Sequence, residues 1–252
     1  MSNLKISLIG YGKMGRQIEN LAVQTFDEKG IEVVSVIDPN YEPVFSRMFC
    51  NQPVFKEISE ESVKDADVCI DFTTQDVIVD NIKKLLILGK NIVVGTTGWN
   101  NESQLGEVRD FVSSYNGGLI YSTNFSVGAN LYFALVERLS ALSINKGYDM
   151  YGVEMHHSEK KDKPSGTARS LENMIFDITG KKIDFASIRA GKITGIHTTG
   201  IDSEFDNIEI THSAKNRGGF AYGALLAAEF IKDRKGFYGP KDFMKYLLEE
   251  RK

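Results

Sequence analysis

The side chains best suited to chemistry lie together in residues 154–167. Two adjacent histidines, His156 and His157, are followed by three lysines and then by a Pro-Ser-Gly-Thr-Ala run. Imidazole and ammonium groups can donate protons to a reacting molecule. The run is typical of a helix N-terminus, whose free N–H groups can bind a carboxylate. The segment therefore predicts a site that binds an acidic molecule and delivers a proton to it.

Structural roles are also open for these residues. On a strand, His156 and His157 point in opposite directions, so at most one can be directed into a given pocket unless the strand breaks. Paired histidines are often structural, and lysines in a loop are often only solvated. No metal site is expected, because no cysteine or third histidine lies at ligand spacing from the pair.

A second group of residues is typical of a dinucleotide site. Gly10, Gly12 and Gly15 form a GxGxxG pattern between an expected strand and an expected helix. The first glycine permits a tight turn, the second lets the backbone approach a pyrophosphate, and the third allows close packing. Asp38 ends the next β run, roughly 20 residues later, where an acid can bind the adenosine ribose. A glycine-rich turn without a ligand is the alternative.

The residue after Asp38 bears on the choice between NADH and NADPH. It is Pro39, so a 2′-phosphate would face a carboxylate with no adjacent guanidinium. The sequence therefore predicts that NADH is favoured. Lys13 or Arg16 could weaken that preference.

Two later segments follow β runs and would lie at the carboxyl edge of the same sheet, where ligands bind in open α/β folds. The first is residues 95–98 (Gly-Thr-Thr-Gly), and the second is residues 122–125 (Ser-Thr-Asn-Phe). Their hydroxyl and amide groups could contact the nicotinamide and its ribose, although ordinary capped turns would look the same. The cofactor-binding residues expected from all these segments are Gly10, Tyr11, Gly12, Lys13, Met14, Gly15, Asp38, Gly95, Thr96, Thr97, Ser122, Thr123, Asn124 and Phe125.

The elements that must position these residues alternate in the first half of the chain. Short β runs separated by helical patterns predict a Rossmann-type, doubly wound parallel sheet covered on both faces. After about Phe125 the β runs carry more polar residues, which predicts a smaller α+β domain with an open mixed sheet. The expected strands are Ile6–Ile9, Val33–Ile37, Val68–Phe72, Ile92–Val94, Leu119–Ser122, Met150–His156, Ala186–Ala190 and Ile208–Thr211.

We therefore expect three regions. Residues 1–126 form a dinucleotide-binding domain, and residues 127–216 form a domain for substrate binding and oligomerisation. Residues 217–252 form helices that return to the first domain.

Composition excludes several other classes. The chain has 252 residues, 42% hydrophobic and 25% charged, as in globular proteins. Its net charge of −4 argues against a general nucleic-acid binder, and no apolar run is long enough to span a bilayer. With no signal-peptide pattern and only two cysteines, Cys50 and Cys69, we expect a cytoplasmic protein that binds neither nucleic acid nor a membrane.

Together the two groups of residues resemble the dihydrodipicolinate reductase family over essentially the whole chain. The family segment Glu-x-His-His-x-x-Lys-x-Asp-x-Pro-Ser-Gly-Thr-Ala is matched from Glu154 to Ala168. Four shorter blocks are also similar, at residues 95–98, at residues 124–128, at residues 189–198 and from Ile210 to Arg217.

The resemblance implies a function. It is the NADH- or NADPH-dependent reduction of a cyclic imine dicarboxylate, hydroxy-tetrahydrodipicolinate, to tetrahydrodipicolinate in the diaminopimelate route of lysine biosynthesis. A homotetramer is also implied. The implied catalytic residues are His156 and Lys160, and the implied substrate-binding residues are His157, Ser165, Gly166 and Thr167.

The sequence departs from the family pattern in three places. Its glycine loop is one residue shorter than usual, Pro39 stands where many members carry Arg, and Lys163 stands where a small residue is common. The first two concern cofactor preference. Two alternatives stay open: another two-domain NAD(P)-dependent dehydrogenase, and a non-enzymatic NADH-binding redox sensor, which could dispense with His156 and Lys160.

Overall fold

The computed structural model describes residues 3–25, 30–41 and 52–248, and these form two compact units. The first unit comprises Met1–Ser126 together with Gly218–Lys252, and the second comprises Val127–Arg217. The chain therefore passes between the units twice. The second unit ends one residue later than the expected 127–216. Cys50 lies outside the described residues.

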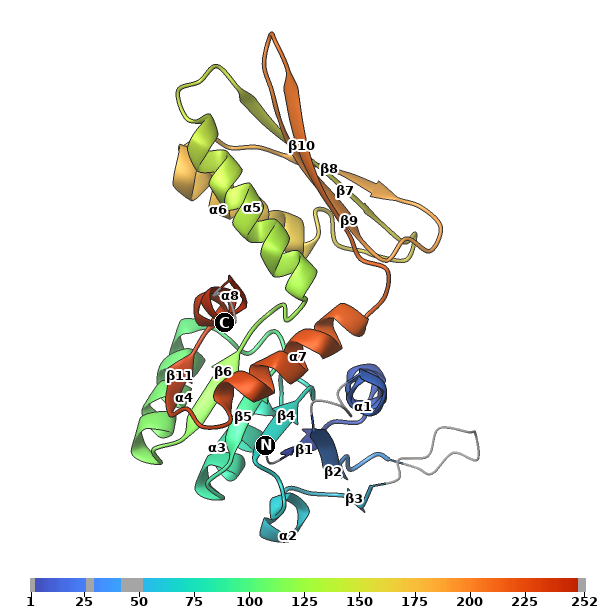
Figure 1. Cartoon of the computed structure of the whole chain (residues 1–252), viewed down its shortest axis with the longest axis vertical. Helices are drawn as coiled ribbons and strands as arrows, with labels where there is room; N and C mark the ends of the chain where they lie inside the picture. Colours follow the sequence, from blue (N-terminus) through green and yellow to red (C-terminus); the bar gives the residue numbers. More distant parts are fainter. Residues whose placement is uncertain (1–2, 26–29, 42–51, 249–252) are drawn as a thin grey trace. The chain divides into compact units, whose positions relative to one another are not determined.

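A seven-stranded sheet forms the centre of the first unit, in the order β11-β6-β5-β4-β1-β2-β3 (Figure 1). Every pair of neighbouring strands in it is parallel. The strand order reverses between β1 and β4, and this is the kind of position where open α/β sheets bind ligands. The strands are β1 (Leu4–Ile9), β2 (Ile31–Ile37), β3 (Val54–Phe55), β4 (Val68–Asp71), β5 (Asn91–Val94), β6 (Gly118–Tyr121) and β11 (Gly236–Tyr238).

Helices cover both faces of this sheet. Successive strand residues point to opposite faces, so an apolar strand such as β5 can bury side chains on both sides. Helices α1 and α7 contact each other, and α7 lies against β4, β5 and β6. Helices α3 and α4 also pack together. The helices of this unit are α1 (Lys13–Thr25), α2 (Glu60–Val63), α3 (Ile78–Ile87), α4 (Glu102–Ser114), α7 (Gly218–Ile231) and α8 (Pro240–Leu248).

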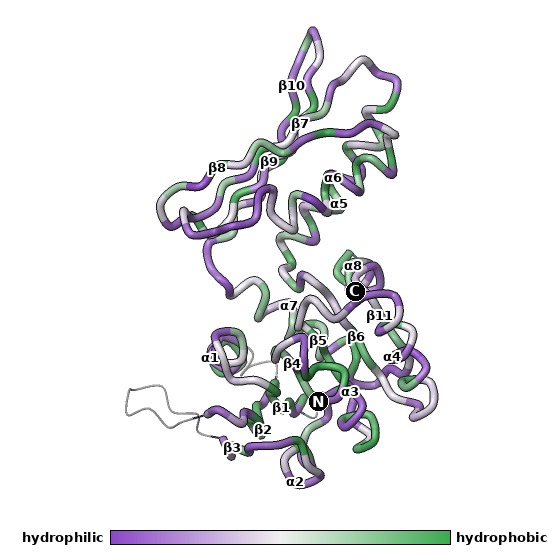
Figure 2. Tube along the Cα trace, turned by 180° about the vertical axis from the view of Figure 1, so that it is seen from behind, coloured by the Kyte–Doolittle hydropathy of each residue, from purple (hydrophilic) through white to green (hydrophobic). Residues whose placement is uncertain are grey.

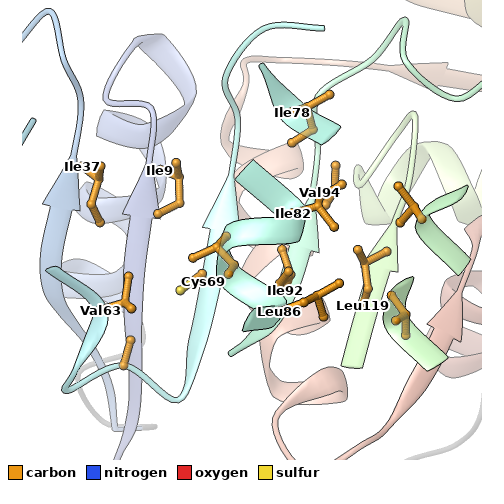
Figure 3. Packing of buried hydrophobic residues seen from close by; sticks show 14 of the residues in the cluster. Ile9, Ile37, Val63, Cys69, Ile78, Ile82, Leu86, Ile92, Val94 and Leu119 are labelled. Carbon is orange, nitrogen blue, oxygen red and sulfur yellow. The ribbon is translucent and has the colours of Figure 1, made fainter. Parts of the chain in front are cut away.

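The core beneath α3 consists of aliphatic side chains from the helix and from alternate strand positions. Ile78, Ile82 and Leu86 of α3 meet Cys69 of β4 and Val94 of β5 (Figure 3). All five are at most 1% exposed. Figure 2 shows the same pattern along the chain, with apolar stretches gathered on the strands of this sheet. No helix in the described part of the chain is long and apolar enough to cross a membrane.

The second unit has a four-stranded mixed sheet, in the order β10-β9-β7-β8. Strands β7 and β8 are parallel, whereas β9 runs antiparallel to β7 and β10. Helices α5 and α6 pack together and share a small core with the sheet, which includes Tyr132, Leu171 and Phe185. The elements are α5 (Val127–Ser143), β7 (Asp149–His156), α6 (Gly166–Thr179), β8 (Phe185–Arg189), β9 (Ile196–Asp202) and β10 (Asn207–Ser213).

This architecture confirms the predicted fold class, a Rossmann-type parallel sheet with a smaller mixed-sheet unit. The prediction lacked β3, β9, β11, α2 and α4. Of these β9 matters most, because it lies inside the second sheet and carries His197. Its sequence, Ile-His-Thr-Thr-Gly-Ile-Asp, has too few apolar residues to read as a central strand.

Candidate functional site

The glycine loop of the first unit has the geometry that phosphate binding requires. Gly10 has φ +85°, and a Cβ there would lie 2.8 Å from the carbonyl oxygen of Phe72. A Cβ on Gly15 would lie 2.4 Å from the Gly10 carbonyl oxygen, so only glycine lets α1 start this close to β1. A Cβ on Gly12, by contrast, would meet nothing within 4 Å. The backbone at Gly12 is therefore accessible to a ligand at the N-terminus of α1.

Asp38 lies beside this loop, just beyond the end of β2. One of its carboxylate oxygens accepts a hydrogen bond from the Tyr11 N–H at 2.8 Å, and the other accepts one from the Asn40 N–H at 2.8 Å. Each oxygen keeps a second lone pair for a ligand hydroxyl. A cavity of about 420 Å³ is lined by Gly10, Gly12, Asp38, Lys56, Thr73 and Lys84, among others. The predicted loop and the predicted acid are thus brought to one cavity.

Asp71, at the carboxyl end of β4, organises the neighbouring turns and was missed by the sequence analysis. Its Oδ1 accepts hydrogen bonds from the Thr73 N–H at 2.8 Å and the Thr73 hydroxyl at 2.6 Å, with the Thr96 hydroxyl at 3.5 Å. Its Oδ2 accepts one from the Asn81 amide at 3.0 Å. Burial raises the Asp71 pKa to about 6 despite these bonds. An acid that ends an apolar β run just before Thr-Thr was the available signal.

The turn after β5 is held from the other side by Trp99. Its Nε1–H donates to the Thr96 carbonyl at 2.8 Å, and the indole is 1% exposed. The Thr96 side chain is buried, whereas Thr97 is exposed. Thr97 is thus the residue of this turn whose side chain is available to a ligand.

The turn after β6 is fixed by a hydrogen bond within the turn and by packing of the Phe125 ring. The Ser122 hydroxyl donates to the Asn124 carbonyl at 2.9 Å, and the Phe125 ring is buried against Phe72 and Phe243. The Phe125 side chain therefore belongs to the core, which leaves only its backbone for a ligand. Thr123 is exposed.

In the second unit, a buried cluster surrounds His156 at the end of β7. Glu154 precedes His156 by two residues, so both side chains lie on one face of the strand. The His156 Nδ1 lies 3.2 Å from Glu154 Oε2, and the His197 Nε2 lies 3.6 Å from the same oxygen. The two imidazole rings form a T-shaped contact, and their centroids are 5.1 Å apart. His197 comes from β9, and its sequence distance from His156 concealed this contact.

Glu154 remains ionised in this buried position. Its Oε1 accepts hydrogen bonds from the Ser165 N–H at 3.1 Å, the Ser187 hydroxyl at 2.6 Å and the Arg189 guanidinium at 2.7 Å. Burial alone would raise the Glu154 pKa, but these hydrogen bonds outweigh it and lower the pKa to about 2. The cluster thus contains a permanent negative charge paired with Arg189.

Burial raises the pKa of a carboxyl group such as Glu154, but it lowers the pKa of the two histidines. It lowers the pKa of His197 to about 4, with a further lowering from the neighbouring His156, so His197 is neutral near neutral pH. Burial also lowers the His156 pKa, but the Glu154 charge opposes it. The Glu154 charge therefore favours the protonated form of His156, against the effect of burial.

The loop after β7 presents the remaining predicted residues. The Lys160 ammonium, 24% exposed, lies 2.9 Å from the Asp162 carboxylate, and its backbone N–H donates to the His157 carbonyl at 3.2 Å. His157 is half-buried. The loop therefore holds a lysine cation and an imidazole near the start of α6.

The start of α6 supplies N–H groups. Ser165 is its N-cap, and the Ser165 hydroxyl accepts from the Ala168 N–H at 3.2 Å and lies 3.1 Å from His197 Nε2. This side chain is therefore already engaged inside the protein. The N–H groups of Gly166 and Thr167 lie in the first turn, where no helical carbonyl is available to them. They are the ones that could bind an anion.

The cluster also bears on the expectation of no metal. One ligand atom each from Glu154, His156 and His197 lies within 4.8 Å of the others. Sequence spacing could not show this, because β9 contributes the third residue. Arg189 already supplies a cation, 2.7 Å from Glu154. The buried carboxylate therefore has its counter-charge within the protein.

Two models of one protein family together match most of the chain. Models of the N-terminus and the C-terminus of dihydrodipicolinate reductase match residues 4–125 and 128–244. The chain belongs to the dihydrodipicolinate reductase family. A relative from Christiangramia forsetii, named 4-hydroxy-tetrahydrodipicolinate reductase, is 32% identical over 98% of this chain and 100% of its own length. A relative of the same name from Methanopyrus kandleri is 35% identical over 72% of each chain.

Solved structures agree on the fold of this dihydrodipicolinate reductase family member. A dipicolinate-bound dihydrodipicolinate reductase from Paenisporosarcina sp. TG-14 has a TM-score of 0.79 and 22% identity, over 95% of this chain and 98% of its own. A myo-inositol dehydrogenase from Corynebacterium glutamicum has a TM-score of 0.60 and 15% identity. The chain is thus an oxidoreductase of a family that uses NAD(P)H.

Proposed function

We infer that this chain is a 4-hydroxy-tetrahydrodipicolinate reductase, acting in the diaminopimelate route of lysine biosynthesis. It uses reduced nicotinamide to convert the hydroxylated cyclic imine dicarboxylate into tetrahydrodipicolinate, with release of water. The observation that carries this proposal is the start of α6. There, two N–H groups without helical partners, on Gly166 and Thr167, lie near two proton-carrying side chains, His156 and Lys160, in a chain that matches the family over both units.

The first unit would hold the cofactor. The open backbone at Gly12 and the N-terminus of α1 would bind the pyrophosphate, and Asp38 would accept hydrogen bonds from the adenosine ribose. The turn residues Thr97 and Thr123 have exposed side chains and would orient the nicotinamide end. Bound there, the cofactor supplies a hydride to a substrate ring carbon conjugated with the imine.

The second unit would hold the substrate and supply the proton. The N–H groups of Gly166 and Thr167 would bind one carboxylate, and His157 would bind a second part of the same dianion. As electron density moves to the ring nitrogen, the Lys160 cation would stabilise it, and His156 and Lys160 would carry the proton that converts the resulting enamine into product. Because hydride transfer is a contact reaction, cofactor and substrate must meet during turnover.

NADH is the proposed preferred cofactor. Asp38 would repel a 2′-phosphate, since Pro39 offers no guanidinium beside it. However, Lys56 lines the same cavity, and its ammonium donates to the carbonyls of Pro39 at 3.2 Å and Tyr41 at 2.6 Å. The Lys56 cation would attract a 2′-phosphate and so weaken the preference for NADH over NADPH. We therefore expect a higher kcat/KM for NADH, and we expect Lys56→Ala to enlarge the NADH-to-NADPH ratio. A large advantage for NADPH in wild-type initial rates would reject the preference.

A homotetramer and a cytoplasmic location complete the proposal. Helices α5 and α6 share a core with the second sheet, and Ile188 and Ile208 on its strands are 44% and 45% exposed. Assembly through this sheet would cover them, and light scattering on the purified protein would measure the assembly. The buried, unpaired thiol of Cys69 is compatible with a reducing compartment.

A coupled assay tests the reaction directly. A synthase would form the unstable substrate from pyruvate and aspartate semialdehyde, and the loss of reduced-cofactor absorbance would be followed. Oxidation should require this protein, both precursors and the synthase. Oxidation at the same rate without the synthase, or none with it, would reject the proposed reaction.

A further inference from the structure

Glu154 is a buried carboxylate that the proposed reaction does not use. It lies on β7 with no exposed surface, two residues before His156 and on the same face of the strand. Burying a charge costs free energy unless other groups compensate for it. A polar or charged core position of this kind therefore calls for an explanation beyond packing.

We propose that Glu154 is a positioning residue, which fixes the His156 ring with Nδ1 toward the carboxylate and Nε2 toward the space beside Gly195. This inference rests on the proposed function, because it deepens the part that His156 takes in proton transfer. Glu154 itself touches neither substrate nor cofactor in this proposal.

The hydrogen bonds of Glu154 give it one fixed orientation. Its Oε1 accepts from three donors on two segments: the Ser165 N–H at the start of α6, and the Ser187 hydroxyl and the Arg189 guanidinium of β8. Rotation of the carboxylate would break all three bonds. Oε2 is therefore held facing the imidazoles, 3.2 Å from His156 Nδ1, and within the described part of the chain neither of these two atoms has a hydrogen-bond partner.

The other edge of the His156 ring faces Gly195. A Cβ at Gly195 would lie 3.2 Å from His156 Nε2 and 3.4 Å from Cδ2, and no other atom is as close. The glycine thus leaves room beside the nitrogen that points away from Glu154. A histidine with one nitrogen against a carboxylate and the other open is in a defined tautomer, ready to transfer a proton at the open nitrogen.

Glu154 also balances the charges around His156. Burial of His156 and the cations of Lys160 and Arg189 lower its pKa, whereas Glu154 and, more weakly, Asp162 raise it. The His197 ring makes a T-shaped contact with it, and His197 is neutral near neutral pH. The carboxylate is thus the main group that keeps His156 able to accept a proton.

Histidine NMR provides a readout that is independent of catalysis, because the chain has only four histidines. In protein labelled on the imidazoles, Glu154→Gln should lower the His156 pKa by roughly one unit or more, as expected for loss of an opposite charge in contact. His212 is the internal reference, since burial alone shifts its pKa. Glu137→Gln, an exposed carboxamide substitution on α5, is the matched control and should shift no histidine.

Kinetics then connect the shift to the reaction. In Glu154→Gln, kcat should fall at least tenfold with a smaller change in the KM of the cofactor, and the His156-dependent limb of the pH profile should move to lower pH. Glu154→Asp, which keeps the charge, should restore part of kcat. Gly195→Ala should also lower kcat, because its Cβ crowds Nε2, without moving the His156 pKa in the same way.

An unchanged His156 titration in Glu154→Gln would overturn the proposal. If the titration shifts and kcat does not, the positioning contact stands but the proposed function of His156 fails. Should Glu154→Gln not fold, the double variant Glu154→Gln/Arg189→Met removes both charges of the buried pair. In that variant the proposal predicts a low kcat, and a wild-type kcat would overturn it.

Discussion

At the scale of single residues, Lys160 is the proposed proton donor, and the loop after β7 holds its side chain in an ion pair. Its ammonium is 24% exposed and lies 2.9 Å from the Asp162 carboxylate, and this ion pair restrains the side chain. The adjacent Lys161 is exposed and forms no ion pair with any residue that the structure describes. Of these two neighbouring lysines, only Lys160 is held in an ion pair among the described residues.

The Lys160→Ala variant should lose kcat by about 10²–10⁴-fold, the range expected for loss of a positioned general acid. Cofactor affinity should change much less, because Lys160 belongs to the second unit. Steady-state kinetics with varied cofactor and substrate would measure both effects. Lys161→Ala is the matched control and should retain nearly full activity. A wild-type kcat in Lys160→Ala would remove this residue from the proposed mechanism.

Sequence reasoning could identify the residues whose motifs have a local spacing, such as Gly10, Gly12 and the His156–Lys160 loop. It could not identify His197 as a partner of His156, because that contact depends on the pairing of β7 with β9. It also could not show that the hydroxyl of Ser165, a residue expected to bind the substrate, caps α6 and contacts His197.

At the scale of elements, the carboxyl ends of β4 and β5 are joined through Asp71. This one carboxylate accepts hydrogen bonds from Thr73 in the turn after β4, from Asn81 in α3 and from Thr96 in the turn after β5. The turns that would orient the cofactor are therefore fixed to a single buried group. That group is costly to ionise, since burial raises its pKa from 3.8 to about 6.

This raised pKa predicts how stability depends on pH. Between about pH 4 and pH 6 the folded state holds a proton on Asp71 that the unfolded state has lost, so wild-type stability falls as pH rises through this window. Asp71→Asn lacks this dependence. The unfolding free energy of the variant relative to wild type should therefore increase by about 3 kcal/mol, at most, from pH 4 to pH 7.

Urea unfolding at several pH values would measure this difference. Asp80→Asn, an exposed position in α3, is the control and should give a difference that hardly changes with pH. If the difference in unfolding free energy between Asp71→Asn and wild type also did not change with pH, the pKa of Asp71 would not be raised in the folded protein.

The predicted elements were those with strong local patterns. The strands of the parallel sheet are nearly continuous apolar runs, as expected for strands buried on both faces, and β1, β2, β4, β5 and β6 were all predicted. Helix α4 was not, because its buried residues are only Val108 and Val112. Strand β11 has three residues and forms only by pairing with β6, a contact that no local pattern encodes.

At the scale of the whole molecule, the chain returns to its first unit after completing the second. The buried amide of Asn91, at the start of β5, donates to the carbonyls of Ile231 at 2.8 Å and Lys232 at 2.7 Å, at the end of α7. Its carbonyl oxygen accepts from the Gly118 N–H at 3.0 Å and the Lys235 ammonium at 3.1 Å. One side chain thus joins the C-terminal segment to two central strands.

The Asn91→Leu variant should be destabilised by about 2–4 kcal/mol, because it leaves several buried polar groups without partners. The midpoint of urea unfolding would measure the loss, and Gln24→Leu, at an exposed position on α1, serves as the control. Equal stability of Asn91→Leu and the control would show that the return of the chain depends on packing alone.

The central claim for the whole molecule is that a hydride passes from a nicotinamide held by the first unit to a substrate ring held by the second. The most direct test uses NADH carrying deuterium at the transferred position, in the coupled reaction, with mass spectrometry of the tetrahydrodipicolinate formed. The account predicts product that is heavier by one deuterium in place of one hydrogen. Product without deuterium, formed while the labelled cofactor is oxidised, would contradict it.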